Sequence, residues 1–293
     1  MIIIFCPVYA GCPSSDLTGD CEVDLEDLGE LADQWLTLYD SDDFAVMSSE
    51  WLLKGASIPD ITWVSISEAG FTGQISKYET TNAQYCQFLN DAIASGDITV
   101  SDNYVYGASG SNGGTDYPFQ VYYDLSGSGY TDNGATDGGA AKINWTGSTF
   151  TVDSGFENHP VTYVNWYGAT AFASYYGWRL PTEWEWQAVA DFNGTFSYGC
   201  GTTINNSIAN CWNSVHPHGT TPVGQFGTYG YGMCDMAGNV WEWTSTVSES
   251  YRVIRGGCWL TNGNNCTVSN WSRSGPLGTG GNLGFRACRD ANP

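Results

Sequence analysis

The sequence predicts a loop-rich fold with few helices, and its composition provides the main observations. The chain of 293 residues contains 37 glycines, aromatic residues make up 15% of it, and charged residues only 14%. From about residue 62 onward, aromatic residues, Gly and Ser alternate with little helical periodicity. Hydrophobic residues make up 42% of the chain, so its composition does not indicate disorder. The length allows one large domain, or a medium domain with a small one.

The charge of the chain excludes several classes of partner. It has 31 acidic and 9 basic residues, which give a formal net charge of −22. Such a protein repels nucleic-acid phosphates and anionic membrane surfaces. No apolar stretch reaches the ~18 residues that span a bilayer, and no Gly-rich segment has the form of a phosphate loop followed by Lys-Ser or Lys-Thr.

The first fifteen residues predict an apolar strand. Residues 1–10 are rich in Ile, Phe, Val and Tyr, which favour strands. An apolar strand has to be covered, either by its own domain or by a neighbouring subunit through strand addition. The sequence leaves both possibilities open.

The most acidic stretch of the chain predicts a calcium loop. Oxygen ligands occur at the spacing of an EF-hand loop, although a Cys stands where Gly is usual and an Asp stands at the twelfth position. The predicted ligands are the side chains of Asp16, Thr18, Asp20, Asp24 and Asp27, together with the carbonyl of Glu22. Calcium would also relieve the repulsion among these carboxylates.

A duplication extends this acidic segment into a loop–helix repeat. Residues 27–36 recur as residues 43–52, and the apolar positions that follow the first loop have helical spacing. The pattern resembles a dockerin module, whose paired loop–helix repeats bind calcium in secreted bacterial proteins. We therefore expect a dockerin-like, EF-hand-type module over residues 16–54.

Three helices are expected in the remainder of the chain. Residues 81–94 and 163–176 have amphipathic spacing, and a third helix begins at Thr182, which forms a capping box with Glu185. Residues 101–158 are rich in Gly, Asp, Asn and Tyr and predict a long irregular stretch with short strands.

Six sequence blocks follow one another along the rest of the chain. The blocks are SKYETTNAQY from Ser76, PVTYVNW from Pro160, WRLPTEWEW from Trp178, DMAGNVWEWT from Asp235, RVIRGG from Arg252 and GFR from Gly284. Together and in this order they resemble the formylglycine-generating (sulfatase-modifying-factor) family. The resemblance covers residues 62–290, and it implies an α+β fold of the C-type-lectin-like kind with little regular secondary structure.

The resemblance also implies a second calcium site. Matched by position, its ligands are the side chains of Asp235 and Glu242 and the carbonyls of Gly238 and Val240. The arginines of the blocks are expected to hold loop carbonyls or carboxylates; they are Arg179, Arg255 and Arg286.

Ten cysteines without any CxxC motif favour an oxidising compartment over a zinc ribbon. Cys200 and Cys211 flank a short Gly/Thr/Asn loop and are the first candidate disulfide. Because the resemblance implies that the Arg-Gly-Gly and Gly-Phe-Arg strands are adjacent, Cys258 and Cys288 are the second. We expect a secreted, extracellular protein of bacterial type.

The resemblance makes a specific statement about catalysis. Family enzymes bind copper through two cysteines, four and nine positions after the second Gly of the Arg-Gly-Gly strand. Here those positions hold Thr261 and Cys266, so the first thiolate is missing. One thiolate does not supply the two-sulfur site that copper(I) prefers, and the side chain of Cys258 is expected to point elsewhere. We therefore predict that the chain is not an enzyme.

The loop after this strand has the composition of an adaptable binding surface, rich in Asn, Ser, Gly and aromatic residues. Its candidate ligand-binding residues are Trp259, Asn262, Asn264, Asn265 and Trp271. Two functions are compatible with these features: a non-catalytic binding or display module for a cell-surface, glycan or protein ligand, and a self-assembling subunit of a fibre, tube or surface layer. The alternative is a copper-dependent formylglycine-generating oxidase with an altered active site.

Overall fold

The computed structural model describes residues 58–68, 70–108, 117–127, 140–212 and 219–291. The chain divides into two units, Met1–Ile58 and Pro59–Pro293, and the second is described by itself. The predicted strand over residues 1–15, the calcium loop with Asp16, Thr18, Asp20, Glu22, Asp24 and Asp27, and the dockerin-like repeat lie outside the described residues.

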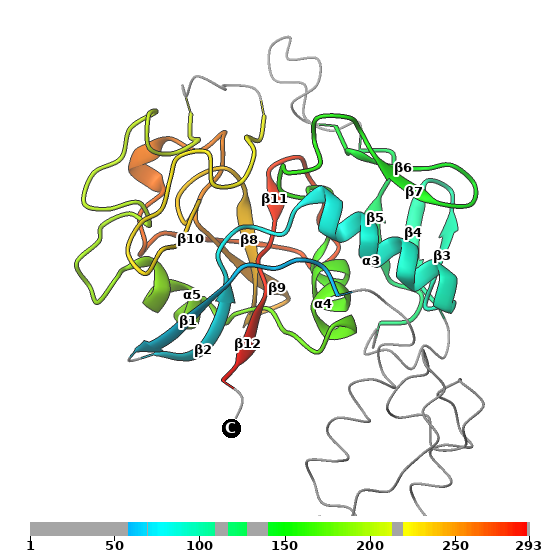
Figure 1. Ribbon diagram of the computed structural model, residues 1–293, viewed down its shortest axis with the longest axis horizontal. Coiled ribbons are helices and arrows are strands. Elements are labelled where there is room, and N and C mark those ends of the chain that lie inside the picture. The colour runs from blue at the N-terminus through cyan, green and yellow to red at the C-terminus, as the bar shows by residue number, and fades with distance from the viewer. Residues whose placement is uncertain (1–57, 69, 109–116, 128–139, 213–218, 292–293) are drawn as a thin grey trace, which may run out of the picture. The chain divides into compact units, whose positions relative to one another are not determined.

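The described domain is a mixture of short strands and three helices longer than one turn (Figure 1). In chain order the elements are β1 (Trp63–Glu68), β2 (Phe71–Ser76), α3 (Asn82–Ser95), β3 (Ile98–Ser101), β4 (Tyr104–Gly107), β5 (Val121–Asp124), β6 (Ile143–Trp145), β7 (Phe150–Val152), α4 (Trp166–Tyr175), α5 (Glu183–Ala190), β8 (Trp241–Ser248), β9 (Tyr251–Arg255), the 3₁₀ turn η1 (Gly263–Asn265), β10 (Trp271–Ser274), β11 (Leu283–Gly284) and β12 (Cys288–Asp290). The three predicted helices are confirmed, and the stretch over residues 101–158 contains short strands as expected.

Two of the helices begin at capping boxes. The Thr81 hydroxyl accepts from the Gln84 backbone N–H at the start of α3, and the Gln84 side chain accepts from the Thr81 N–H. Thr182 and Glu185 make the same pair of bonds at the start of α5. These boxes satisfy backbone donors that have no partner within the helix. The role of Glu185 as a helix cap is therefore confirmed.

The strands form four small sheets among the described residues. A sheet of order β10-β9-β8-β11 lies at the centre, and a sheet of order β1-β2-β12 joins the first two strands to the last one (Figure 1). The strands β3, β4 and β5 form a meander, and β6 pairs with β7. The central sheet places β8 between β9 and β11, which matters for the cysteines described below.

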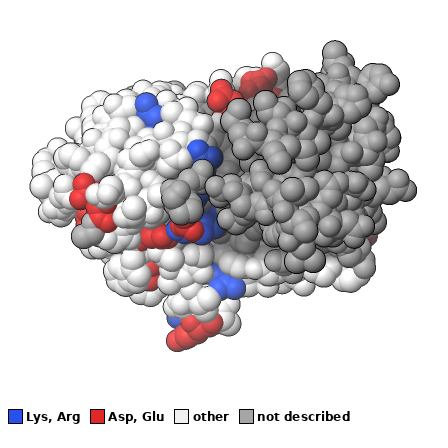
Figure 2. Space-filling view, turned by 60° about the horizontal axis from the view of Figure 1, so that its bottom comes forward, with Lys and Arg blue, Asp and Glu red and all other residues white. Residues whose placement is uncertain are grey.

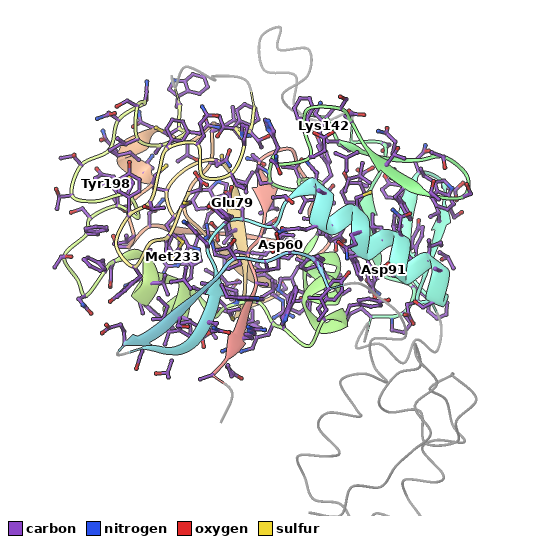
Figure 3. All side chains as sticks on the ribbon, in the orientation of Figure 1. Asp60, Glu79, Asp91, Lys142, Tyr198 and Met233 are labelled. Carbon is purple, nitrogen blue, oxygen red and sulfur yellow. The ribbon has the colours of Figure 1, made fainter. Side chains whose placement is uncertain are left out.

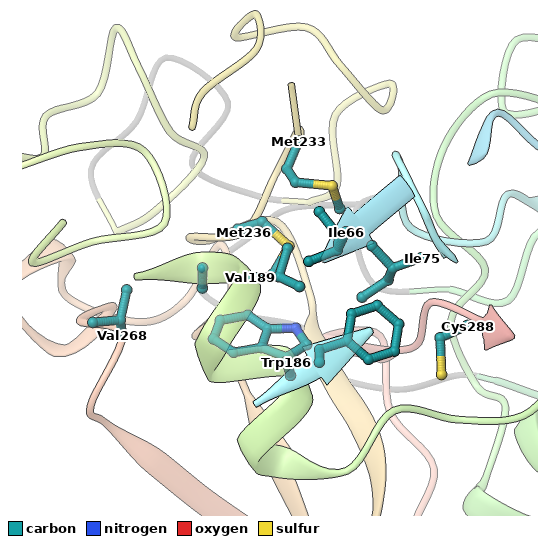
Figure 4. Packing of buried hydrophobic residues seen from close by; sticks show 10 residues of the cluster. Ile66, Ile75, Trp186, Val189, Met233, Met236, Val268 and Cys288 are labelled. Carbon is teal, nitrogen blue, oxygen red and sulfur yellow. The ribbon is translucent and has the colours of Figure 1, made fainter. Parts of the chain in front are cut away.

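The core is built largely from aromatic rings. The rings of Tyr85 and Phe88 of α3 lie 5.8 and 5.7 Å from the ring of Phe172 of α4, measured between centroids, and Phe285 lies 5.3 Å from Phe172. A second cluster surrounds the fully buried Trp186 of α5 and is shown in Figure 4. Ring pairs at these separations stabilise a core beyond the area that they bury, so a fold with few helices can still be rigid.

The surface of the described domain is not uniformly acidic. On the face shown in Figure 2, most of the described surface is neither acidic nor basic, and charged residues of both signs form small separate groups. None of the described helices is both long enough and apolar enough to cross a membrane.

Candidate functional site

A buried ion pair joins Glu242 of the central strand β8 to Arg286, which follows β11. Arg286 donates through Nε to Glu242 Oε2 at 2.6 Å and through Nη2 to Glu242 Oε1 at 2.7 Å, and both side chains are 0% exposed. The indole N–H of Trp186 also donates to Glu242 Oε2, at 2.7 Å. Arg286 uses its remaining N–H groups on the carbonyls of Ser76, Lys77 and Cys234. The guanidinium thus holds three chain segments together and neutralises one buried carboxylate.

A second buried carboxylate, Glu79, lies near the middle of the described domain (Figure 3). Its oxygens accept from Asn239 Nδ2 at 2.6 Å and from the Val240 backbone N–H at 3.1 Å. Burial raises the pKa of Glu79 well above its ordinary value, and the nearby charges of Asp235 and Glu242 raise it further. We call Glu79, Asp235, Glu242 and Arg286 the carboxylate centre.

Asp235 is the third carboxylate of this centre and has a left-handed backbone, with φ of 57°. One oxygen accepts from the Gly224 N–H at 2.6 Å. Burial raises its pKa to about 6, and the charge of Glu242 adds to that shift. Three carboxylates therefore share one guanidinium, so an ionised Glu79 and Asp235 would leave an excess of negative charge that a bound cation would compensate.

The four ligands implied for calcium do not all fit that role equally well. The Asp235 carboxylate is buried and has a raised pKa, and Gly238 (φ +83°) lies in a tight segment, where a Cβ atom would come 2.3 Å from the Asn210 carbonyl oxygen. The described residues contain no group of three or more His, Cys, Asp or Glu side chains placed to hold a metal ion. Val240 donates its backbone N–H to Glu79, a bond that does not involve the carbonyl predicted as a ligand. Glu242 fits less well, because both of its oxygens already accept from Arg286. Asp235, with Gly238 and Val240, remains a prediction as a metal site.

The loop that follows β9 contains the two positions matched to the copper-binding cysteines. Thr261 stands at the first position, and its hydroxyl accepts from the Cys258 N–H at 3.1 Å. The Cys258 sulfur lies 3.2 Å from the same hydroxyl oxygen. The expectation that Cys258 points away from this position is therefore wrong: its thiol lies against the residue that replaces the missing one.

Cys266, at the second position, is buried in a small apolar cluster with Cys200, Cys211 and Ala237. Burial raises the pKa of the Cys266 thiol, and the neighbouring Cys211 and Cys258 raise it further. The thiol is therefore protonated at neutral pH. Copper(I) is bound by thiolates, and Thr261 and Cys266 together supply only one sulfur ligand.

Residues 65–291 match the family described as "Sulfatase-modifying factor enzyme 1-like domain". The chain belongs to this family. The C-type-lectin-like fold implied by the sequence is supported by a solved structure, "Crystal Structure of CarF", which aligns with 80% of this chain and 97% of its own at a TM-score of 0.53 and 19% identity. At that identity the likeness concerns the fold alone.

Curated relatives of this family member match about half of the chain. It is 34% identical over 173 residues to the formylglycine-generating enzyme of Streptomyces coelicolor, covering 47% of this chain and 55% of that protein. It is 36% identical over 160 residues to "Serine/threonine-protein kinase pkn1" of Chlamydia caviae, covering 47% of this chain and 25% of that protein. It is 32% identical over 153 residues to "Inactive C-alpha-formylglycine-generating enzyme 2" of Bos taurus, covering 45% and 50%. The chain therefore spans about half or less of the length of these relatives.

The two expected disulfides are not formed, because all of the cysteines that the structure describes are free. Cys200 and Cys211 lie in one apolar cluster, as their predicted proximity requires, but both are free thiols. The pairing of Cys258 with Cys288 is wrong: β8 separates β9 from β11 in the central sheet, Cys288 lies in β12, which pairs with β2 in a different sheet, and both cysteines are free. Cys288 instead lies in the Trp186 cluster and accepts from Arg179 at 3.1 Å.

The predicted ligand-binding loop is only partly available to a ligand. Trp259 is 1% exposed and donates its indole N–H to the Gly281 carbonyl, so its assignment as a contact residue is wrong. Asn262, which caps η1, is exposed, as are Asn264 and Asn265. Trp271 on the edge strand β10 is 50% exposed. The surface is thus built from the asparagines and Trp271.

Sequence patterns missed two features of the site. Glu79 lies in a quoted block, yet nothing local indicates that its carboxylate meets Asn239, 160 residues later. The pairing of Glu242 with Arg286 was not predicted either. Its signal was the presence of one Glu and one Arg in quoted blocks that otherwise contain few charged residues, since buried charges are usually paired.

Proposed function

We propose that the chain is a secreted, calcium-binding, non-catalytic member of its family that acts as an extracellular binding or display module, or as a self-assembling structural subunit. Thr261 in place of a copper-binding cysteine supports the absence of oxidase activity. The family also has a relative that is named inactive, the Bos taurus protein.

The observation that carries the binding role is the exposed edge strand β10 of the central sheet. Trp271 at the start of β10 is 50% exposed, and the asparagines of the 262–265 turn, a few residues earlier in the chain, are exposed as well. Among the described strands, β10 pairs with β9 alone, so its other edge is unpaired. An unpaired strand edge that carries a large aromatic side chain can pair with another chain or pack against a ligand.

Calcium enters this proposal through two sites. The carboxylate centre would hold one ion at Asp235, where it would supply positive charge and fix the segment between Asp235 and β8. The loop containing Asp16, Asp20 and Asp24 would hold another. Ions at these sites would stabilise the fold by binding only the folded state.

Light scattering and electron microscopy with calcium and with a chelator test this proposal. Assembly that requires calcium would identify a structural subunit. A strict monomer that binds a cell surface or glycan in calcium would identify a display module, and in that case Trp271→Ala with Asn262→Ala should weaken binding. A strict monomer that binds neither would contradict both forms of the proposal.

One observation favours the oxidase alternative. The Cys258 thiol lies beside Thr261, so Cys258 and Cys266 are the two thiols that would have to hold copper. Copper-dependent oxygen consumption with a cysteine-containing sulfatase peptide, accompanied by formylglycine in the peptide mass, would establish this alternative. We expect neither signal, and loss of any signal in Cys258→Ser would be the control.

A further inference from the structure

An open cavity of about 420 Å³ lies beside α5, apart from the carboxylate centre and from the 262–271 loop. It is bordered by the end of β1, by the outer face of α5 and by the turn that follows α5. Its lining includes Glu68, Trp184, Gln187, Asp191 and Asn193.

Trp184 provides a flat apolar surface at this cavity. Its side chain is 63% exposed, whereas Trp186, two residues later on the same helix, is fully buried. Two residues turn an α-helix by about 200°, so the two indoles lie on opposite faces. The guanidinium of Arg255 lies 6.0 Å from the Trp184 ring. An exposed indole is a large, rigid contact surface that costs little conformational entropy to bind.

Gln187 contributes a hydrogen-bond donor whose direction is fixed. Its Oε1 accepts from Arg255 Nη2 at 2.6 Å, and a guanidinium has only donors, so the amide oxygen has to face it. Arg255 is itself held by the carbonyls of Val268 and Asn270 at 3.0 and 2.9 Å. The NH₂ group of Gln187 is therefore presented by an amide that lines the cavity.

The turn after α5, which places Asn193 at the cavity, has a left-handed backbone that is unfavourable for Phe192. Phe192, Asn193 and Gly194 have φ of 46°, 60° and 71°, and a bulky residue such as Phe rarely adopts this region. The Phe192 ring is packed 4.7 Å from Tyr231, and Asp191 Oδ1 accepts from the Gly194 N–H. The surrounding packing thus maintains a strained turn, a feature that is often found at binding sites.

The chemistry of the lining selects the class of ligand. Glu68 and Asp191 are acidic, and no Lys or Arg is among the described residues that line the cavity, so its lining disfavours anions. A simple cation would use the carboxylates but cannot accept a hydrogen bond from the amide NH₂ groups of Gln187 and Asn193, which line the same cavity. A ring with several neutral hydroxyl groups both donates to carboxylates and accepts from amides, while its C–H face packs on an indole. The geometry points to a neutral saccharide bound at this cavity, with its ring stacked on Trp184.

This site uses none of the residues of the proposed loop surface. Its failure would leave the binding or assembly role of Trp271 and Asn262 intact, and the reverse also holds.

The test is binding of the full chain, in calcium, to an array of neutral oligosaccharides, followed by titration with the best ligand. We expect Trp184→Ala to lower affinity at least about tenfold, as removal of a stacking tryptophan does, while Trp184→Phe retains part of it. Gln187→Glu keeps the contact with Arg255 but removes the donor, and should also weaken binding. Thermal unfolding should be unchanged in Trp184→Ala, because the side chain is exposed.

Trp212→Ala is the matched control, since Trp212 is a 42% exposed tryptophan outside the cavity. It should bind as the wild type does. Absence of binding to every neutral glycan overturns the inference, as does equal binding by Trp184→Ala. Binding of an oligolysine peptide in place of sugars, lost in Trp184→Ala, would also overturn it and would assign the cavity to a cationic ligand.

Discussion

The carboxylate centre and the 258–266 loop lie in the same domain and differ in how completely their polar groups are used. In the centre, Arg286 satisfies Glu242 and three backbone carbonyls, and Glu79 is bonded to Asn239 and Val240. In the loop, Thr261 replaces a thiol and Cys266 is a buried thiol among apolar neighbours. The two regions differ in kind: the residues that hold the fold make a closed set of polar contacts, whereas the positions matched to the copper-binding cysteines hold one hydroxyl and one buried thiol.

The largest expected effect comes from breaking the centre. Arg286→Met would leave the Glu242 carboxylate buried and unpaired, which costs about 3–5 kcal/mol of folding free energy. Urea unfolding would measure this, and Arg286→Met combined with Glu242→Gln should recover part of the loss. Arg273→Met, which removes an exposed pair with Glu249, should cost no more than about 1 kcal/mol. Equal effects of the two arginine variants would show that the centre does not hold the fold.

Two tryptophans of the loop region, Trp259 and Trp271, test which residues support the fold and which belong to the exposed surface. Trp259→Ala removes a fully buried indole and should cost about 3–5 kcal/mol. Trp271→Ala removes a half-exposed one and should change stability by about 0.5 kcal/mol or less. The two melting curves decide between the assignments, and a stable Trp259→Ala variant would return that residue to the binding surface.

The pH dependence of stability tests the excess charge of the centre. Asp235 has a folded-state pKa of about 6, above its ordinary value of about 4. The folded protein thus binds this proton more tightly, so its contribution to stability is present below pH ~4 and is lost as pH rises through ~6.

In the presence of a chelator, the melting temperature of the wild type should therefore fall as the pH rises from about 4 to about 6. The melting temperature of Asp235→Asn should fall less over the same range. Calcium should oppose the decline, because it binds the ionised carboxylate. If stability depended on pH in the same way in the wild type and in Asp235→Asn, the raised pKa of Asp235 would be refuted.

A smaller change in stability than that of Arg286→Met or Trp259→Ala is expected at Thr261, in the 258–266 loop. Thr261→Cys removes the hydroxyl that accepts from the Cys258 N–H, at a cost of about 1 kcal/mol. It also supplies a second thiol beside Cys266, so binding of copper(I) should become tighter in competition with a chelating dye. Thr261→Ser keeps the hydroxyl and is the control. If copper(I) binding does not change, then the rest of the site has also diverged from the family enzymes.

The parts of this structure that could be predicted from sequence are those that local chemistry decides. The capping boxes at Thr81 and Thr182 fix the starts of two helices, because their partners lie three residues away. By contrast, the strand β11 has only two residues, Leu283–Gly284, and carries no periodicity that a sequence could reveal.

The errors concern contacts between distant segments. The expected pairing of Cys258 with Cys288 requires two neighbouring strands, but β8 lies between β9 and β11, and Cys288 itself lies in β12 of a different sheet. Trp259 belongs to a loop with the composition of a surface, yet its indole is buried against the Gly281 carbonyl. Burial of one residue in such a loop depends on where the chain returns, and composition does not encode that.

The sheet of β1, β2 and β12 has a mechanical consequence. Both outer strands are antiparallel to β2, so β1 and β12 run parallel to each other with β2 between them. Tension that draws the start of β1 and the end of β12 apart acts along the strands in opposite directions. The backbone hydrogen bonds of β2 would then be loaded together in shear instead of opening one after another. A domain tethered through these two strands would resist extension by force more strongly than its equilibrium stability alone suggests.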